Sequence, residues 1–342
     1  MKTMNGFMHG VNLGGWFSQC VHTTEHYDSF ISEEDIRRIS GWGLDHVRLP
    51  IDYELVEDKD GNYIEEGFSR IAEVLQWCSR YGLNMVLDLH KTYGFSFDDG
   101  EEESGFFENE EYQERFYRLW EQLASRFGGH RDHLAFELLN EVTDKEYCAK
   151  WNSIAAQCVR RIRAVCGDIR ILIGGYYNNS IEALKDLDPP CDENIIYNFH
   201  CYEPLIFTHQ GAYWVKGMDT DFRMPLDLTY GEYSENTRMQ IGQFSTGVEG
   251  FDPGRKFGAE FFSELISEAV SVAEERNVAL YCGEFGVIDR AAPEDALEWY
   301  RMICSVFDRY GIGRAAWSYR MMDFGLIDDH MKDVSEELIG LL

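Results

Sequence analysis

The stretch 134-LAFELLNEV-142 is an almost wholly apolar run that ends on an amide, Asn140, followed by a carboxylate, Glu141. Apolar residues at nearly every position are typical of a strand that is buried on both faces, as in a parallel sheet. The two polar residues follow where such a strand would leave the core. Polar groups at the carboxyl end of a barrel strand usually serve chemistry, although an ordinary solvated strand end would look the same.

A second stretch, 280-LYCGEFGV-287, repeats this pattern, with Glu284 near the end of the apolar run and glycines close on both sides. If both strands belong to one barrel, Glu141 and Glu284 arrive at the same rim. Two carboxyl groups are what hydrolysis of a glycosidic bond requires: one stays ionised and attacks the anomeric carbon, and the other stays protonated and donates to the leaving oxygen. The pair therefore indicates a glycosidase.

Short motifs elsewhere in the chain accompany the two glutamates: Arg48 in HVRLP, His90 in LDLH, His200 and Tyr202 in YNFHCYEP, and Trp317 in AAWSY. Together with FELLNEV and YCGEFG, these motifs resemble glycoside hydrolase family 5, the retaining glycosidases of clan A. The likeness covers essentially the whole chain in the right order. Within the family, GVNLGGW, FTHQ and LYCGEFGVI look most like the non-modular clostridial endoglucanase C type.

The resemblance implies an α/β fold, a (β/α)8 TIM barrel, with residues 1–342 as a single catalytic domain. Eight strand–helix units can be counted along the chain, in agreement with this fold. The implied activity is that of a retaining endo-β-1,4-glucanase acting on soluble β-glucans, both cellulose-type and mixed-linkage 1,3-1,4 glucans. Glu284 would be the nucleophile and Glu141 the acid/base, and the mechanism needs neither a cofactor nor a metal ion.

The resemblance also implies how the first sugar is held. Asn140 is expected to hold the sugar 2-hydroxyl, and His90 to contact hydroxyls of the sugar in subsite −1. Trp317 is expected to form the floor of that subsite. His200 is expected to lie near Glu141.

Arg48 lies in the apolar strand predicted for 46–51, and a lone buried arginine needs a carboxylate partner. Glu284 is the partner that we expect, because such a pair would keep a nucleophilic carboxylate ionised. The alternative is a salt bridge between Arg48 and some structural acid. The resemblance places Tyr202 within hydrogen-bond reach of Glu284.

Three further residues are weaker candidates for substrate binding. Lys91 stands where many relatives have a second histidine, and it could either bind a glycan hydroxyl or simply face water. Asn178 follows the strand predicted for 170–175 and is a plausible donor to sugar hydroxyls at the rim. Trp214 could stack on a sugar ring, because the faces of a pyranose are apolar.

Residues 203–258 form the least regular stretch, which is far longer than an ordinary strand–helix loop. We expect a small lid subdomain inserted after the sixth strand. Most of its aromatic residues are expected to form a small core of their own, with Trp214 as the exception. These residues are Phe207, Tyr213, Trp214, Phe222, Tyr230, Tyr233, Phe244 and Phe251.

The composition limits which classes of partner the protein can bind and in which compartment it is expected. A formal net charge of −30 disfavours nucleic acid and anionic membranes as partners, whereas a neutral β-glucan suffers no such repulsion. The chain shows no run of apolar residues long enough for a membrane span and no secretory leader, so we expect a monomer that is cytoplasmic or secreted after signal removal. The nine cysteines are an odd number without a C-x-x-C pair, which favours free thiols.

Several other functions remain open at this point. An exo-acting β-glucosidase or exo-β-1,3-glucanase would need a cleft blocked at one end, which the 203–258 insertion could supply. A β-mannanase would differ in its contacts to an axial 2-hydroxyl. A non-catalytic glycan-binding barrel would normally lack one glutamate, and a metal-dependent hydrolase would normally show local ligand spacing such as H-E-x-x-H, which is not present.

Overall fold

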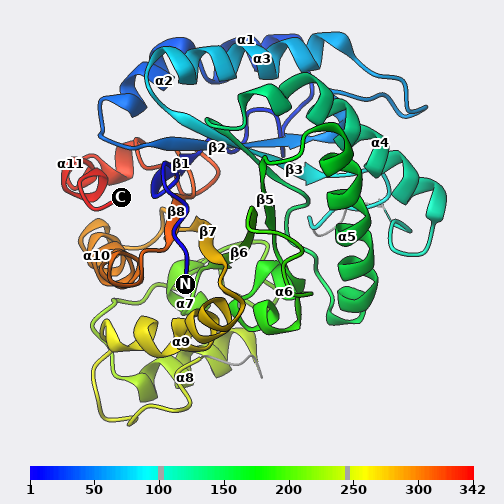
Figure 1. The fold of residues 1–342 in the computed structure, drawn as a ribbon. Coiled ribbons are helices and arrows are strands. Elements are labelled where there is room, and N and C mark those ends of the chain that lie inside the picture. The colour runs from blue at the N-terminus through cyan, green and yellow to red at the C-terminus, as the bar shows by residue number, and fades with distance from the viewer. Residues whose placement is uncertain (99–103, 243–246) are drawn as a thin grey trace.

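The computed structural model describes residues 1–98, 104–242 and 247–342. Eight parallel strands form a closed barrel in sequence order, because β1 pairs with both β2 and β8. Helices surround the strands (Figure 1). This confirms the predicted (β/α)8 TIM barrel. The strands are β1 His9–Asn12, β2 His46–Asp52, β3 Asn84–Lys91, β4 Leu134–Glu137, β5 Arg170–Ile173, β6 Ile195–Cys201, β7 Ala279–Phe285 and β8 Gly313–Ala316.

The helices of the outer ring follow from apolar stripes and capping residues. In α4, the Asn109 side chain accepts a hydrogen bond from the Glu111 amide at the start of the helix. Pro293 begins α10, and Gly311 ends it with a left-handed backbone (φ 65°). The helices are α1 Thr24–Phe30, α2 Glu33–Ser40, α3 Glu65–Arg80, α4 Glu110–Phe127, α5 Cys148–Val165, α6 Tyr176–Asn179, α7 Leu205–Thr208, α8 Tyr230–Ile241, α9 Glu260–Arg276, α10 Pro293–Tyr310 and α11 Ser335–Ile339.

The barrel interior changes from apolar to polar along its axis. A cluster of buried side chains near the amino ends of the strands includes Phe7, Val86, Leu172 and Tyr281. The next layer toward the carboxyl ends is polar and contains the fully buried Arg48. Active sites of this fold lie at the carboxyl ends of the strands, so the apolar cluster closes the opposite end.

Two strands are shorter than the sequence predicts: the fourth, and the fifth, which ends at Ile173 and not at residue 175. The fourth ends at Glu137, so Asn140 and Glu141 lie in the loop beyond it, and the eighth ends at Ala316, one residue before Trp317. Glu141 has a left-handed backbone (φ 45°), which a strand cannot accommodate. Asn140, Glu141 and Trp317 therefore reach the rim on turns after their strands.

In the described part of the segment between β6 and α9, the chain forms two helices, α7 and α8. Its aromatic side chains pack mainly against one another and against α9: the ring centroids of Tyr233 and Phe257 lie 4.9 Å apart, and those of Phe257 and Phe261 lie 5.0 Å apart. In Figure 1, α8 lies at the outer edge of the molecule, beyond α9. Phe244 lies outside the described residues, and Trp214 belongs to a different cluster, considered below.

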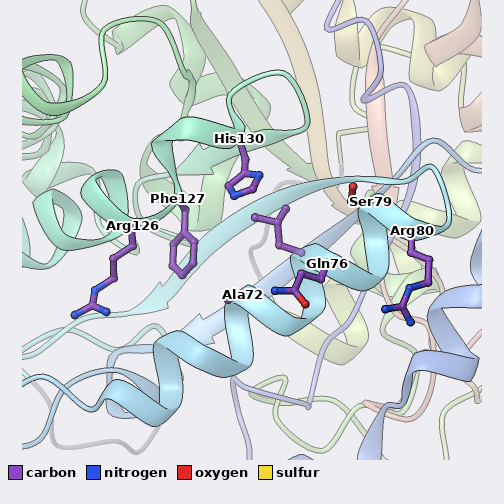
Figure 2. Close-up of a pocket in the computed structure, with 8 residues that line it drawn as sticks. Ala72, Gln76, Ser79, Arg80, Arg126, Phe127 and His130 are labelled. Atoms are coloured by element: carbon purple, nitrogen blue, oxygen red, sulfur yellow. The ribbon is translucent and has the colours of Figure 1, made fainter.

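A hollow of about 470 Å³ lies between α3 and α4 (Figure 2). Barrel helices run antiparallel to the strands, so the carboxyl ends of α3 and α4 place this hollow toward the amino end of the barrel. Its two arginines are already paired, Arg80 with Glu33 and Arg126 with Glu65. The lining residues are Ala72, Leu75, Gln76, Ser79, Arg80, Arg126, Phe127 and His130. The hollow is therefore separate from the candidate site.

Within the described ranges, no helix combines the length and the apolar character that crossing a bilayer requires. Each of the nine cysteines is a free thiol.

Candidate active site

Glu141 and Glu284 meet at the carboxyl end of the barrel. Glu284 lies on β7, and Glu141 lies in the loop after β4. Three atoms lie within 4.8 Å of one another: one carboxyl oxygen of each glutamate and a ring nitrogen of His200 on β6. Both glutamates are buried, with exposed fractions of 9% for Glu141 and 5% for Glu284. Two carboxyl groups about 5–5.5 Å apart are the arrangement found in retaining glycosidases.

Arg48 connects the barrel interior to Glu284. Its Nη1 donates to Glu284 Oε1 at 2.8 Å, which is the contact that the sequence predicts. Its other nitrogens form a two-pronged pair with Glu137 on β4, with Nε to Oε2 at 2.7 Å and Nη2 to Oε1 at 2.8 Å. Nη2 also lies 3.0 Å from Asp88 Oδ2. Arg48 is therefore held rigidly, because three carboxylates share one buried guanidinium.

Glu137 and Asp88 were not among the residues singled out from the sequence. Both are completely buried: Glu137 is the last residue of β4, and Asp88 lies within β3. Asn198 on β6 supports this arrangement, because its Nδ2 donates to Glu137 Oε1 at 2.7 Å while its Oδ1 accepts from the Gly283 amide at 3.0 Å. The available signal was a carboxylate at an interior position of a buried strand, which requires a partner of opposite charge.

The neighbours of Glu284 are hydrogen-bond donors. Tyr202 donates its hydroxyl to Glu284 Oε2 at 2.9 Å, as predicted, while Arg48 donates to Oε1. Burial and the adjacent Glu284 charge raise the pKa of Tyr202, so its hydroxyl keeps its proton. Both oxygens of Glu284 thus accept a hydrogen bond, which fixes the orientation of the carboxyl group.

The surroundings of Glu141 are different. Burial raises the pKa of Glu141, and Asn178 Nδ2, which donates to Oε2 at 3.0 Å, is uncharged. The other oxygen, Oε1, lies 2.7 Å from His200 Nδ1. Burial lowers the pKa of His200 to about 4, so this imidazole is neutral near neutral pH. The two glutamates thus occupy contrasting environments, with a charged guanidinium beside Glu284 and only neutral groups hydrogen-bonded to Glu141.

Three predicted sugar-binding residues lie beside this pair. Asn140 Oδ1 accepts from Arg48 Nη2 at 2.9 Å, and its buried Nδ2 has no hydrogen-bond partner among the described residues, so this donor is available to a ligand. His90 Nδ1 lies 2.5 Å from Asp88 Oδ2. The His90 ring lies parallel to Trp317, with 5.8 Å between ring centroids.

The weaker candidates have varied surroundings. Lys91 is buried and its Nζ lies 2.7 Å from Asp98 Oδ2, so the alternative in which Lys91 faces water is wrong. The half-buried Trp214 packs near Phe324, with 6.4 Å between centroids, in a cluster that also contains Trp317. Trp214 is therefore close to the floor residue expected for subsite −1, apart from the small core of the insertion.

Glu141, His200 and Glu284 are close enough to share a metal ion. However, hydrogen-bond donors already approach both oxygens of each glutamate: Arg48 and Tyr202 approach Glu284, while Asn178 and the His200 ring nitrogen approach Glu141. A cation would have to compete with a fixed guanidinium for Glu284. The donor set fits a pair of carboxyl groups better than a metal centre.

A closed parallel barrel with two buried carboxyl groups in contrasting environments at its carboxyl end has the architecture of a glycoside hydrolase. The profile of the family described as Cellulase (glycosyl hydrolase family 5) matches residues 7–323. The chain belongs to this family and is a glycoside hydrolase.

Individual relatives agree with this assignment. Cellodextrinase A of Ruminococcus flavefaciens is 48% identical over 314 residues, covering 92% of this chain and 86% of the relative. Endoglucanase C of Acetivibrio thermocellus is 38% identical over 354 residues, covering 99% and 98% of the two chains. Among solved structures, endoglucanase Cel5A of Thermotoga maritima aligns with a TM-score of 0.77 and 25% identity, covering 98% of this chain and 97% of that one. The predicted likeness to the clostridial endoglucanase C type is confirmed.

Proposed function

We propose that this protein is a retaining endo-β-1,4-glucanase that hydrolyses soluble β-glucans, of the cellulose type and of the mixed-linkage 1,3-1,4 type. The observation that carries the proposal is the pair Glu141 and Glu284, whose oxygens lie within 4.8 Å of each other in contrasting environments. The relatives that are named endoglucanase C and cellodextrinase A support a β-1,4-linked glucan as the substrate.

In the first step, the Glu284 carboxylate attacks the anomeric carbon and forms a covalent glycosyl-enzyme. The bond to the leaving oxygen breaks at the same time, and Glu141 gives this oxygen a proton. The raised pKa of Glu141 suits this role, because a general acid must hold its proton until the transition state. The donors Arg48 and Tyr202 hold Glu284 in place for the attack.

In the second step, Glu141, now ionised, takes a proton from a water molecule, and the hydroxide attacks the anomeric carbon. The bond to Glu284 breaks, and the sugar leaves with its original configuration. Asn140 holds the 2-hydroxyl through its available Nδ2, a contact that strengthens as positive charge develops on the ring. His90 and Trp317 position the same sugar from the side of β3 and β8.

The 203–258 segment is proposed to act as a lid over one end of the cleft. Trp214 supports this role, because it places the segment in the same cluster as Trp317 and Phe324. A lid at this position suits short chains, and cellodextrinase A, the 48% identical relative, has a name that denotes action on such chains. An exo-acting or oligosaccharide-preferring enzyme is therefore the second candidate.

The products formed over time from barley mixed-linkage β-glucan distinguish the two candidates, with Glu284→Gln as the blank. A spread of oligosaccharides in the first minutes supports endo action. Glucose alone from the start would show that the 203–258 segment closes one end of the cleft. No product from β-glucan, together with activity on mannan, would overturn the proposed substrate, and wild-type activity in Glu284→Gln would overturn the mechanism.

A further inference from the structure

The turn that follows β5 has an unusual backbone. Tyr177, Asn178 and Asn179 are consecutive residues in the left-handed region, with φ values of 49°, 56° and 56°. This region is disfavoured for residues with a side chain, although asparagine tolerates it better than most. Such a run persists only where the surrounding structure holds it in place, and it often accompanies a functional site.

Two hydrogen bonds hold this turn against the loop that carries Glu141. The Tyr177 amide donates to the Thr143 carbonyl at 3.1 Å, and the Asn178 amide donates to the Val142 carbonyl at 3.0 Å. These carbonyls belong to the two residues immediately after Glu141. The turn and the glutamate are therefore fixed relative to each other through the backbone, independently of their side chains.

The side chains of the turn approach both oxygens of Glu141. Asn178 Nδ2 donates directly to Oε2 at 3.0 Å. Asn179 contacts Glu141 indirectly, through His200. Its Nδ2 lies 3.4 Å from His200 Nε2, and His200 Nδ1 lies 2.7 Å from Glu141 Oε1. The side chain of Asn179 is completely buried.

Gly174 makes room for this arrangement. A Cβ atom at this position would lie 2.1 Å from Asn179 Oδ1, so only glycine leaves space for the amide. With Asn179 Nδ2 directed at His200 Nε2, that nitrogen must accept, and the proton of the neutral ring is on Nδ1. His200 Nδ1 then donates to Glu141 Oε1. Both oxygens of Glu141 thus receive a neutral donor that this turn controls.

We propose that Asn178 and Asn179 are positioning residues for Glu141: Asn178 by a direct hydrogen bond to Oε2, and Asn179 by selecting the His200 tautomer that donates to Oε1. This inference rests on the proposed acid/base role of Glu141. Neither asparagine needs to contact the substrate. The two donors keep the carboxyl group in one orientation in both steps, while its proton leaves and returns.

The electrostatic consequence has a definite sign. The Asn178 hydrogen bond stabilises the ionised form of Glu141 and so opposes the effect of burial on its pKa. Removing this donor raises the pKa of Glu141 further. The other charged and titratable groups around Glu141 are His200 on β6, Glu284 on β7, Arg48 on β2, His90 on β3 and Asp98.

The test compares Asn178→Gly with Asn178→Asp. Glycine keeps the left-handed backbone without strain and removes only the amide, whereas aspartate replaces the donor with a second carboxylate. For each variant, kcat/KM is measured as a function of pH. It is also compared between two substrates with different leaving groups, 2,4-dinitrophenyl β-cellobioside and phenyl β-cellobioside. The dinitrophenolate leaves without a proton, so only the phenyl substrate depends on the acid.

In Asn178→Gly we expect kcat/KM for the phenyl substrate to fall about tenfold, as expected for the loss of one hydrogen bond to a catalytic group, with a much smaller change for the dinitrophenyl substrate. The alkaline limb of the pH profile should move to higher pH in Asn178→Gly, and further, by about one unit or more, in Asn178→Asp. Equal losses on both substrates, or an alkaline limb that does not move, would overturn the role of Asn178.

Two controls separate the possible failures. Tyr177→Gly relieves strain in the same turn without removing a contact to Glu141, so the alkaline limb of its pH profile should stay in place. If this limb moves as far as it does in Asn178→Gly, the backbone of the turn, and not the side-chain amide of Asn178, is responsible. Glu141→Ala should slow the phenyl substrate far more than the dinitrophenyl substrate. If Glu141→Ala slows both substrates equally, the proposed function fails. If Glu141→Ala behaves as expected but Asn178→Gly has no effect, only the positioning role of Asn178 is rejected.

The role of Asn179 has its own measurement. In protein labelled with ¹⁵N-histidine, with the signals assigned by comparison with His200→Asn, His200 should show a protonated Nδ1 and an unprotonated Nε2. Asn179→Asp places an acceptor beside Nε2 and should convert this nitrogen to the protonated form. An Nε2-protonated ring in the wild-type protein, or no change in Asn179→Asp, would overturn the selection of the tautomer by Asn179.

Discussion

Glu137→Gln tests the buried charge network that holds Arg48. The substitution keeps the size of the side chain and removes its charge. Glutamine can still accept one hydrogen bond from Arg48, but its amide group would face the second guanidinium nitrogen, donor against donor. The two charge-assisted contacts of 2.7 and 2.8 Å are thereby reduced to one.

The structure sets the magnitude of this effect. Removing one partner of a buried ion pair costs about 3–5 kcal/mol. Arg48 keeps Asp88 at 3.0 Å and Glu284 at 2.8 Å, so we expect the lower end, about 3 kcal/mol. An unfolding entropy of about 2.1 cal/mol/K per residue over 342 residues converts this loss into a fall in Tm of about 4 °C.

Differential scanning calorimetry measures the change, with Glu108→Gln as the matched control. Glu108 pairs with Lys150 at 2.7 Å, but both side chains are about half exposed. The same chemical substitution should cost about 0.5 kcal/mol at this surface pair, a shift in Tm below about 1 °C. If Glu137→Gln lowers Tm no more than Glu108→Gln does, the account of Arg48 as a residue held by buried carboxylates is refuted.

Three further predictions concern the site itself. The kcat/KM for cellotetraose should fall on the alkaline side of the pH profile as Glu141 loses its proton. Because burial raises the pKa of Glu141, this alkaline limb should lie above the ordinary range of a glutamate pKa. An alkaline limb within the ordinary range would contradict the environment described for Glu141. Trp317→Ala should raise KM for cellotetraose about tenfold with an unchanged circular dichroism spectrum, because the floor of the subsite is lost; an unchanged KM would remove Trp317 from subsite −1. Incubation with EDTA should leave kcat/KM unchanged, whereas a loss that one metal ion restores would favour the metal-dependent alternative.

The barrel and the meeting of its two glutamates could be predicted from the sequence because both depend on local pattern. A short apolar run such as 134–139 is typical of a strand that is buried on both faces, and the carboxyl ends of parallel strands lie at one rim. Arg48 could be paired with Glu284 by the same reasoning, since a buried charge needs a partner. The contact with Tyr202 was expected from the family resemblance.

The rest depends on contacts between distant parts of the chain. Glu137 is the two-pronged partner of Arg48, yet a single glutamate in an apolar strand does not reveal which side of the strand faces the barrel interior. The left-handed backbone of Glu141 and of the 177–179 turn arises from hydrogen bonds between two loops, and no local pattern encodes it. Lys91 was equally ambiguous, because its partner Asp98 lies in the following loop.

The most direct test of the central claim is the configuration of the first product. Hydrolysis of cellopentaose followed by ¹H NMR from the first minutes shows which anomer of the new reducing end appears before mutarotation mixes the two. Two carboxyl groups at the spacing of Glu141 and Glu284 predict that the β-anomer appears first, through a covalent intermediate on Glu284. The α-anomer as the first product would mean inversion and would contradict the double displacement proposed for this site.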